Sequence, residues 1–208
     1  MFKRSIAVAL VGACLAFGAH AEDRVYTYVE GGWNWLGDDE IDFDGPHGRF
    51  SLGIGPNFYI RGGYRDLESD SSPEVDAEDW ELGGGIHFPI AQNVDVYGDA
   101  TYGQFDFEVD RHDISGDTDY YTLGAGLKAW LARNLEGSAE FRYMDTDDID
   151  VSAGNRRFIA RGEDDWSLGG SLVGYFGQVR NLGVGVNYRY WTEEDTNEAT
   201  VFVRWAFR

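Results

Sequence analysis

The chain has 208 residues and a formal charge of −20, from 37 acidic and 17 basic side chains. Because affinity for nucleic-acid phosphates comes from clustered cations, no nucleic-acid partner is expected for so acidic a chain. Hydrophobic residues make up 43% of it, with 7 Trp, 12 Tyr and 13 Phe, which is enough to bury a core and argues against disorder. The 28 glycines and the many aromatics suit one domain of ordinary size or one membrane barrel.

Residues 1–21 have the pattern of a cleaved signal peptide. Lys3 and Arg4 form a positive start, residues 6–17 form a short apolar stretch, and residues 19–21 (Ala-His-Ala) fit the small-x-small cleavage pattern. The apolar stretch is too short to span a bilayer. We therefore predict export through a signal peptide, with residues 22–208 as the mature domain.

A second interpretation of the same region is lipidation at Cys14, which follows a weak lipobox at residues 11–13. The apolar run before this cysteine is short and continues beyond it, so the sequence favours cleavage after Ala21. The remaining residues then contain no cysteine and need no disulfide in an oxidising compartment.

The rest of the chain alternates between apolar and polar residues with period 2, as strands do, and has no apolar run of eighteen residues. Clear examples are residues 120–129, 182–191 and 198–207. The pattern predicts ten strands, near residues 25–36, 48–55, 58–67, 78–88, 94–108, 119–130, 135–145, 165–176, 182–192 and 197–207.

The connections between these strands alternate between short and long. Each short connection ends in an asparagine that opens the next alternating run, as expected for hairpin turns. The long connections are rich in Asp, Glu, Ser and Gly. This rhythm requires an even number of strands, with both termini of the chain at the short-turn end. The short turns are residues 55–57, 91–93, 132–134 and 179–181.

The strand near 94–108 carries apolar residues on one face as far as Tyr102, and then Gln104, Asp106 and Glu108 continue that face. Either a bulge shifts the register or the strand extends beyond the membrane. The second interpretation is simpler.

Charged residues share the strand face opposite the apolar one. A soluble barrel such as a lipocalin would turn the apolar face inward, and Gly31-Gly32-Trp33 is similar to a lipocalin motif. A membrane barrel would instead turn the charges into its lumen, where seven cations and six anions could form a polar network. The predicted lumen residues are Glu30, Arg49, Arg61, Arg65, Glu81, Asp95, Asp99, Lys128, Glu136, Glu140, Arg142, Arg189 and Arg204.

Aromatic residues favour the membrane, because they gather at the ends of the apolar faces as interfacial girdles do. An Arg facing the middle of the bilayer would cost about 2–4 kcal/mol, so the charges belong in the lumen. The predicted girdle residues are Trp33, Trp35, Tyr64, Trp80, Phe88, Trp130, Phe141, Tyr143, Trp166, Phe176, Tyr190 and Trp205.

Residues 97–105 and 121–127, together with the final alternation of Val203, Trp205 and Phe207, resemble the small Gram-negative outer-membrane barrels of the OmpA and OmpX kind. The resemblance implies a closed, antiparallel, up-and-down transmembrane β-barrel in the outer membrane. It also implies contact with outer-membrane lipid and lipopolysaccharide, and recognition of those three terminal residues by the barrel-assembly machinery. This chain departs from the family in having ten strands rather than eight, and in ending with Arg208.

The expected role is non-enzymatic: a structural or surface-interaction protein in adhesion, host contact or envelope stress. The alternatives are a small passive channel for ions or solutes and an outer-membrane protease similar to the omptins. The omptin alternative rests on Asp110 and His112, which would face Asp66, Glu68 and Asp70 and activate water.

Acidic segments indicate weak binding of divalent cations. Glu40, Asp42 and Asp44 match the first half of an EF-hand loop, although Ser51 stands where the final glutamate is needed. No other cofactor is expected. Loosely bound Ca²⁺ or Mg²⁺ could couple the protein to lipopolysaccharide, and the acidity suits cationic surface partners. The second acidic set is Asp145, Asp147, Asp148 and Asp150.

Overall fold

The computed structural model describes residues 25–37, 42–69, 75–109, 114–154, 156–177, 181–193 and 195–207. Within these ranges, no helix is long and apolar enough to cross a membrane. Strands account for most of the described chain. They are β1 (Tyr28–Gly37), β2 (Asp42–Ile54), β3 (Phe58–Ser69), β4 (Val75–Ala91), β5 (Val94–Val109), β6 (Ile114–Ala132), β7 (Leu135–Thr146), β8 (Ile149–Ala153), β9 (Arg156–Ala160), β10 (Asp164–Phe176), β11 (Leu182–Trp191) and β12 (Asn197–Ala206).

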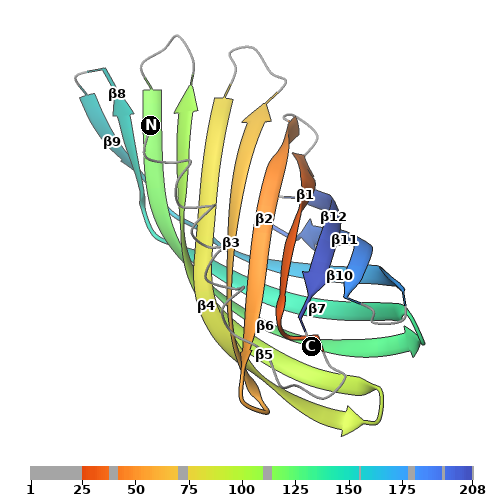
Figure 1. The fold of residues 1–208 in the computed structure, drawn as a ribbon. Helices are drawn as coiled ribbons and strands as arrows, with labels where there is room; N and C mark the ends of the chain where they lie inside the picture. The colour runs from red at the N-terminus through yellow and green to blue at the C-terminus, as the bar shows by residue number, and fades with distance from the viewer. Residues whose placement is uncertain are drawn as a thin grey trace.

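Ten of these strands close into an antiparallel barrel. The sheet runs β5-β4-β3-β2-β1-β12-β11-β10-β7-β6, and pairing of β5 with β6 closes it (Figure 1). The first and last strands also pair, with Tyr28 opposite Ala206 and Gly37 opposite Asn197. Closure leaves no free barrel edge, so backbone groups facing hydrocarbon are paired. The prediction of ten strands rather than eight is confirmed.

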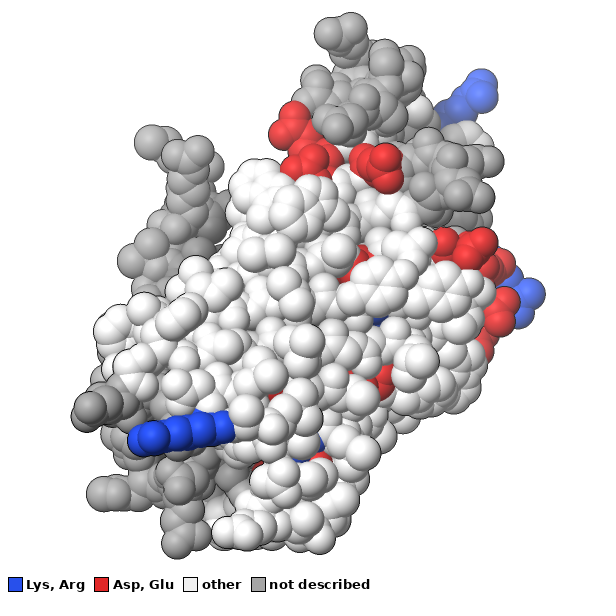
Figure 2. Space-filling model, turned by 90° about the vertical axis from the view of Figure 1, so that its right-hand side faces the viewer, with Lys and Arg blue, Asp and Glu red and all other residues white. Residues whose placement is uncertain are grey.

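The barrel wall has its charges inside and its apolar residues outside. Along β12, Glu198, Thr200, Phe202 and Arg204 are buried, while the alternating residues such as Val201 are exposed. The side of the wall shown in Figure 2 is largely uncharged. This orientation is that of a membrane barrel, and the lipocalin alternative, with its apolar face inward, is wrong.

The turn asparagines join neighbouring hairpins to one another. The carbonyl oxygen of Asn57 accepts a hydrogen bond from the backbone of His87 at 2.8 Å, and that of Asn93 accepts one from Trp130 at 2.9 Å. Asn134 and Asn181 do the same for the backbones of the next strands at 2.8 and 2.6 Å. The repeated asparagine therefore links each turn to the adjacent hairpin and closes the rim at this end.

The strands on one side are longer than the sequence indicates. β5 pairs with β4 as far as Val75 opposite Val109, and its only register shift against β4 lies at the other end, between Pro89 and Ala91. The alternative of a bulge in the outer part of this strand is therefore wrong, and the strand continues unbroken to Val109. β4 and β6 extend with it, so much of the chain predicted as acidic loop is extended sheet.

The hairpin of β8 and β9 is absent from the sequence-based prediction, which placed a loop there. β8 pairs with the outer end of β6, with Asp117 opposite Asp150, and β9 pairs with β8. In Figure 1 this hairpin stands beside the projecting ends of β2 to β6. Five-residue strands within a polar segment offer too few alternations to be recognised.

The lipid-facing wall yields a direct test. Leu127 is exposed on β6, between Tyr121 and Leu131 on the same face, and we expect Leu127→Arg to reduce the free energy of unfolding from bilayers by about 2–4 kcal/mol. Ile159→Arg is the matched control, because this exposed residue lies on β9 beyond the wall and should change stability by less than about 0.5 kcal/mol. Urea titration of both proteins in vesicles measures the difference, and equal effects would contradict the assigned lipid face.

Candidate functional site

The barrel interior holds all thirteen charged residues predicted to face the lumen, and adds Asp79 and Glu198. Most of them join in ion pairs between strands that are not neighbours in the sheet. We call these fifteen residues the lumen network. They comprise seven cations and eight anions.

The longest part of the network is a continuous chain of ion pairs across the barrel. It begins with Asp79, which receives two bonds from Arg65 at 2.6 and 2.8 Å, and it continues through Glu198 and Arg189. Its full order is Asp79, Arg65, Glu198, Arg189, Glu140, Arg142, Asp99, Arg61 and Glu81. This ion-pair chain links β3, β4, β5, β7, β11 and β12 through the lumen.

Arg142 is the most buried cation of the network, with 2% of its surface exposed. Its guanidinium donates to Asp99 at 2.9 Å, to Glu140 at 3.1 Å and to the hydroxyl of Thr122 at 2.6 Å. A fork-shaped donor with three acceptors is well satisfied even without water.

A second group of pairs lies nearer the turn end. Arg204 donates to Glu30 at 2.8 Å and to Glu136 at 2.9 Å, and Arg49 pairs with the other oxygen of Glu30 at 2.5 Å. The Arg204 guanidinium also lies 4.0 Å from the centre of the Tyr28 ring. This turn-end group joins β1, β2, β7 and β12.

Tyrosines complete the network by donating to its carboxylates. The hydroxyls of Tyr59, Tyr97 and Tyr120 donate to Asp99, Glu140 and Asp79 at 3.0, 2.9 and 2.6 Å. Their rings need room, and glycines on adjacent strands provide it. A Cβ at Gly85 would lie 2.5 Å from Cζ of Tyr59, and one at Gly103 would lie 2.3 Å from Cζ of Tyr120. The high glycine content thus serves close packing inside the barrel.

The first described residues, 25–27, close the turn end of the lumen. The carbonyl oxygen of Val25 accepts a hydrogen bond from Lys128 at 3.2 Å, and the ring of Tyr26 stacks on His87 at 3.7 Å. His87 in turn lies 3.5 Å from Asp95. The three residues are at most 5% exposed, although the sequence pattern placed them in the first strand.

The network fills the lower half of the barrel. The space left among Arg49, Arg61, Arg204 and their neighbours is a cavity of about 80 Å³, which holds a few water molecules at most. The ion-pair chain, the turn-end group and residues 25–27 therefore leave little free volume in this part of the lumen. Chemically, the arrangement holds the strands together.

Outward-facing carboxylates form ladders on the projecting part of the sheet. Residues directly opposite across strands have side chains about 5 Å apart, and like charges at that distance repel. We call the two ladders the acidic wall. The first contains Asp66, Glu78, Asp106, Asp117 and Asp150, and the second contains Asp44, Glu68, Asp76 and Glu108.

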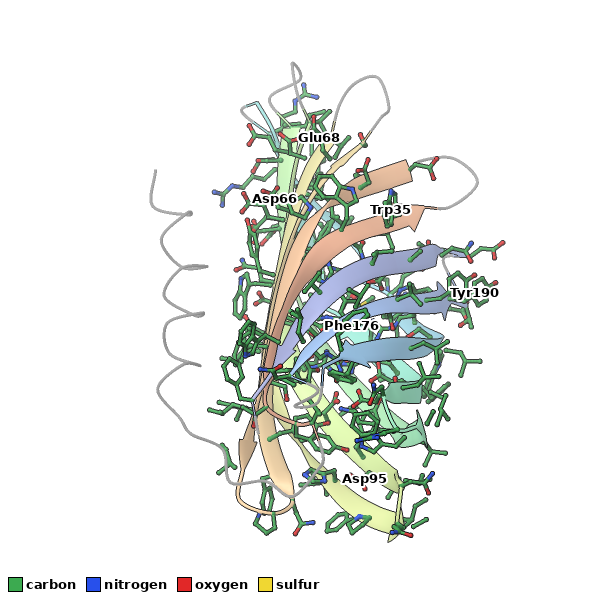
Figure 3. The ribbon with its side chains drawn as sticks, turned by 45° about the vertical axis from the view of Figure 1, so that its right-hand side comes forward. Trp35, Asp66, Glu68, Asp95, Phe176 and Tyr190 are labelled. Carbon is green, nitrogen blue, oxygen red and sulfur yellow. The ribbon has the colours of Figure 1, made fainter. Side chains whose placement is uncertain are left out.

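The acidic wall lies at the end of the barrel opposite the turns. Figure 3 shows Asp66 and Glu68 at this end and Asp95 at the other, and Figure 2 shows acidic residues gathered at the same upper end. Sequence patterns located this acidity in loops, but the ladders arise because strands extend and bring side chains into register.

Weak cation binding by the EF-hand-like segment stays a prediction, and Glu40 of that segment lies outside the described residues. Asp42 and Asp44 belong to strand β2, which turns both side chains outward instead of wrapping them around an ion. Asp44 accepts a hydrogen bond from the indole of Trp33 at 2.6 Å. Within the described ranges, no group of three or more His, Cys, Asp or Glu has the geometry to hold a metal.

The second acidic set is spread over different elements. Asp145 is the penultimate residue of β7 and faces outward opposite Asp164. Asp147 and Asp148 lie in the connection to β8, and Asp150 belongs to the acidic wall. Loose binding of divalent cations by these residues stays a prediction.

Aromatic residues surround the barrel below the acidic wall. Tyr102 contacts Trp80 and Tyr121, with ring centres 5.6 and 5.2 Å apart, and Trp166 contacts Tyr143 at 4.5 Å. Trp35 and Tyr190 lie along the same edge in Figure 3.

Trp130, predicted to belong to the aromatic girdle, instead packs inside against Tyr175 with ring centres 5.5 Å apart. Trp130 lies on the even-numbered face of β6 with Thr122 and Lys128 and stands opposite the buried Glu136. Strand alternation therefore places it on the inward face, and its assignment to the girdle is wrong.

The proposed assembly residues lie at the end of β12. Val203 and Trp205 are exposed toward the lipid, at 51% and 49%, and Phe207 follows the strand with its backbone bonded to Thr27 at 2.9 Å. Their recognition by the assembly machinery stays a prediction.

Removal of one member of the network leaves buried partners unpaired. We expect Arg204→Met to lower the free energy of unfolding by about 3–5 kcal/mol, because Glu30 and Glu136 remain buried with fewer donors. Arg133→Met, at an exposed turn residue, is the control that removes the same charge with little effect. Urea titration in vesicles provides the measurement, and a loss below about 1 kcal/mol for Arg204→Met would show that the network is not coupled.

The comparisons with known proteins agree with this architecture. The family profile described as "Outer membrane protein beta-barrel domain" matches residues 5–190. No curated protein matches the chain by sequence.

Several solved structures share the fold at low identity. The β domain of the Bordetella autotransporter BrkA has a TM-score of 0.54 at 11% identity, over 88% of this chain and 100% of that one. The translocator domain of the autotransporter NalP from Neisseria meningitidis has 0.51 at 10% identity, over 99% and 96%. The outer-membrane protease OmpT from Escherichia coli has 0.50 at 11%, over 88% and 94%. The chain thus belongs to the outer-membrane β-barrel family and is a barrel of the Gram-negative outer membrane.

Proposed function

We propose that this barrel is a non-enzymatic, non-conducting membrane anchor that presents the acidic wall to cationic partners at the cell surface. Adhesion, host contact or a response to envelope stress would each use such a surface. The observation that carries the proposal is the lumen network. A lumen filled by paired charges is poorly suited to transport, so the outer surface is the part of the barrel that can bind partners.

The acidic wall supports the choice of a cationic partner. Asp117 stands between Asp106 and Asp150 in one cross-strand ladder, with no opposite charge in the register positions beside it. Like charges placed directly opposite destabilise a sheet, so a cation bound beside Asp117 and Asp150 would relieve this repulsion. Divalent cations, cationic peptides and basic protein surfaces share this chemistry.

Lipid and lipopolysaccharide are the expected neighbours of the same region. The aromatic girdle, with Trp80, Tyr102 and Tyr121 in contact, suits the interface, where amphipathic rings settle at the level of the head groups. Ca²⁺ or Mg²⁺ held loosely between the acidic wall and lipid phosphates would join the two anionic surfaces. Insertion would depend on Val203, Trp205 and Phe207 as the signal for the assembly machinery.

The enzymatic alternative rests on residues outside the described ranges. Asp110 and His112, the pair needed for omptin-like hydrolysis, are among them, so our proposal of a non-enzymatic role relies on the filled lumen and the acidic wall. A peptidase assay with Asp110→Ala and His112→Ala tests it, since loss of a measured activity in both variants would favour the hydrolase.

The channel alternative is tested by conductance. We expect the refolded protein to give no stable unitary steps in planar bilayers, because the network blocks the lumen. Replacing the neutral pair Arg61 and Glu81, which are 2.6 Å apart, by serine in one double variant should create a measurable conductance. The proposal would be contradicted if the unaltered protein gave unitary conductance steps and the double variant gave the same steps.

The partner chemistry is tested with polylysine added to vesicles that contain the protein. An exposed ion pair contributes on the order of 0.5 kcal/mol, so neutralising four carboxylates of the acidic wall should weaken binding by about tenfold or more. The variant carries Asp76→Asn, Glu108→Gln, Asp117→Asn and Asp150→Asn.

The matched control removes four carboxylates that lie outside the ladders. Equal losses of polylysine affinity in the two variants would show attraction to net charge alone and would contradict a role for the acidic wall. The control variant carries Asp145→Asn, Asp147→Asn, Asp148→Asn and Asp164→Asn.

A further inference from the structure

A cavity of about 390 Å³ lies in the outer half of the barrel, above the ion-pair chain. This volume falls in the range of small-molecule sites, roughly 300–1,000 Å³. Its lining comes from both sides of the barrel, from β1 to β8 and from β11 and β12. It is therefore a property of the closed fold and not of one hairpin.

The upper lining of this cavity is apolar. Leu36, Phe43, Phe105, Met144 and Ile149 belong to it, from five different strands. All five come from the inward face of their strands, whose alternate residues face lipid or the outside. Such a lining favours the hydrocarbon part of a ligand.

The floor of the cavity presents cations, although its charges are formally paired. The Arg65 side chain is 27% exposed, while its partners Asp79 and Glu198 are each 6% exposed. The Arg49 side chain is 25% exposed and its partner Glu30 is fully buried. The arginines thus cover their carboxylates, and a molecule entering the cavity meets guanidinium groups.

His47 lies among these arginines without a hydrogen-bond partner. It faces inward on β2, directly opposite Arg65 on β3 and two residues from Arg49. The residue is 7% exposed, it lines the cavity, and neither ring nitrogen has a partner. Buried polar groups are normally satisfied, so an imidazole placed here indicates a missing hydrogen-bonding ligand.

We propose that this cavity binds an amphipathic monoanion, with the anionic head on His47, Arg49 and Arg65 and the hydrocarbon tail along the apolar lining. An imidazole donates to an anion from whichever ring nitrogen carries hydrogen, and two guanidinium groups add charge-assisted donors. A fatty carboxylate of medium length has this chemistry. The site is separate from the acidic wall, which lies on the outer face of the same strands.

The test uses octanoate and the full barrel in lipid nanodiscs, followed by calorimetric titration with empty nanodiscs subtracted. We expect saturable binding of octanoate, at least tenfold weaker binding of 1-octanol, and no measurable binding of acetate. If 1-octanol bound as tightly as octanoate, the cationic floor would have no role. If acetate bound as tightly as octanoate, the apolar lining would have none. Either result, or octanoate heats equal to those of empty nanodiscs, would overturn the proposal.

Two variants locate the site. His47→Leu should weaken octanoate binding by at least tenfold while leaving octanol unchanged. Leu36→Trp should abolish both by filling the cavity, whereas Leu127→Trp, the same substitution on the lipid face, should leave both unchanged. Heat-modifiable gel migration checks that each variant is folded. Octanoate affinity unchanged in folded His47→Leu and Leu36→Trp proteins would place any binding elsewhere and overturn the proposal.

Discussion

The structure depends on one constraint: a charge on the lipid-facing part of the barrel wall has to point inward, and once inside it needs a partner. A charge facing hydrocarbon costs several kcal/mol, and an unpaired charge in the low dielectric of a filled lumen is also unfavourable. Arg142 and Arg204 show the solution, because each serves two carboxylates from different strands. The glycines that make room for tyrosine rings, and the tyrosine hydroxyls that donate to the carboxylates, both serve this network.

Much of this fold could be predicted from period-2 alternation, because the strand face is decided by sequence parity alone. Thirteen residues of the lumen network are on the inward face for that reason. Asp79 and Glu198 were missed although parity puts them on the inward face with Glu81 and Arg204, because they stand at the ends of the predicted strands next to acidic loops. Trp130 was assigned to the aromatic girdle although parity places it on the inward face with Lys128. The acidic wall depends on cross-strand register, which no single strand encodes. The cavity depends on closure and is invisible in sequence.

The two ends of the barrel differ in chemistry. The turn end is closed by residues 25–27 and by the asparagine carbonyls, which tie each hairpin to the next. The outer end carries a cavity whose floor is cationic and a wall whose outer face is anionic, separated by the thickness of one sheet. Strand alternation alone produces this separation, since His47 and Asp44 are only three residues apart on β2 and face opposite sides.

Spin labels placed one at a time along residues 121–131 of β6, in a Cys14→Ser chain reconstituted in bilayers, test the filled, inside-out barrel most directly. Collision with oxygen reports lipid contact, and collision with a water-soluble nickel complex reports aqueous contact. Between Tyr121 and Trp130, odd-numbered positions should be accessible to oxygen and even-numbered positions to neither reagent. Even-numbered positions accessible to the nickel complex along the whole strand would reveal an open aqueous lumen and contradict the account.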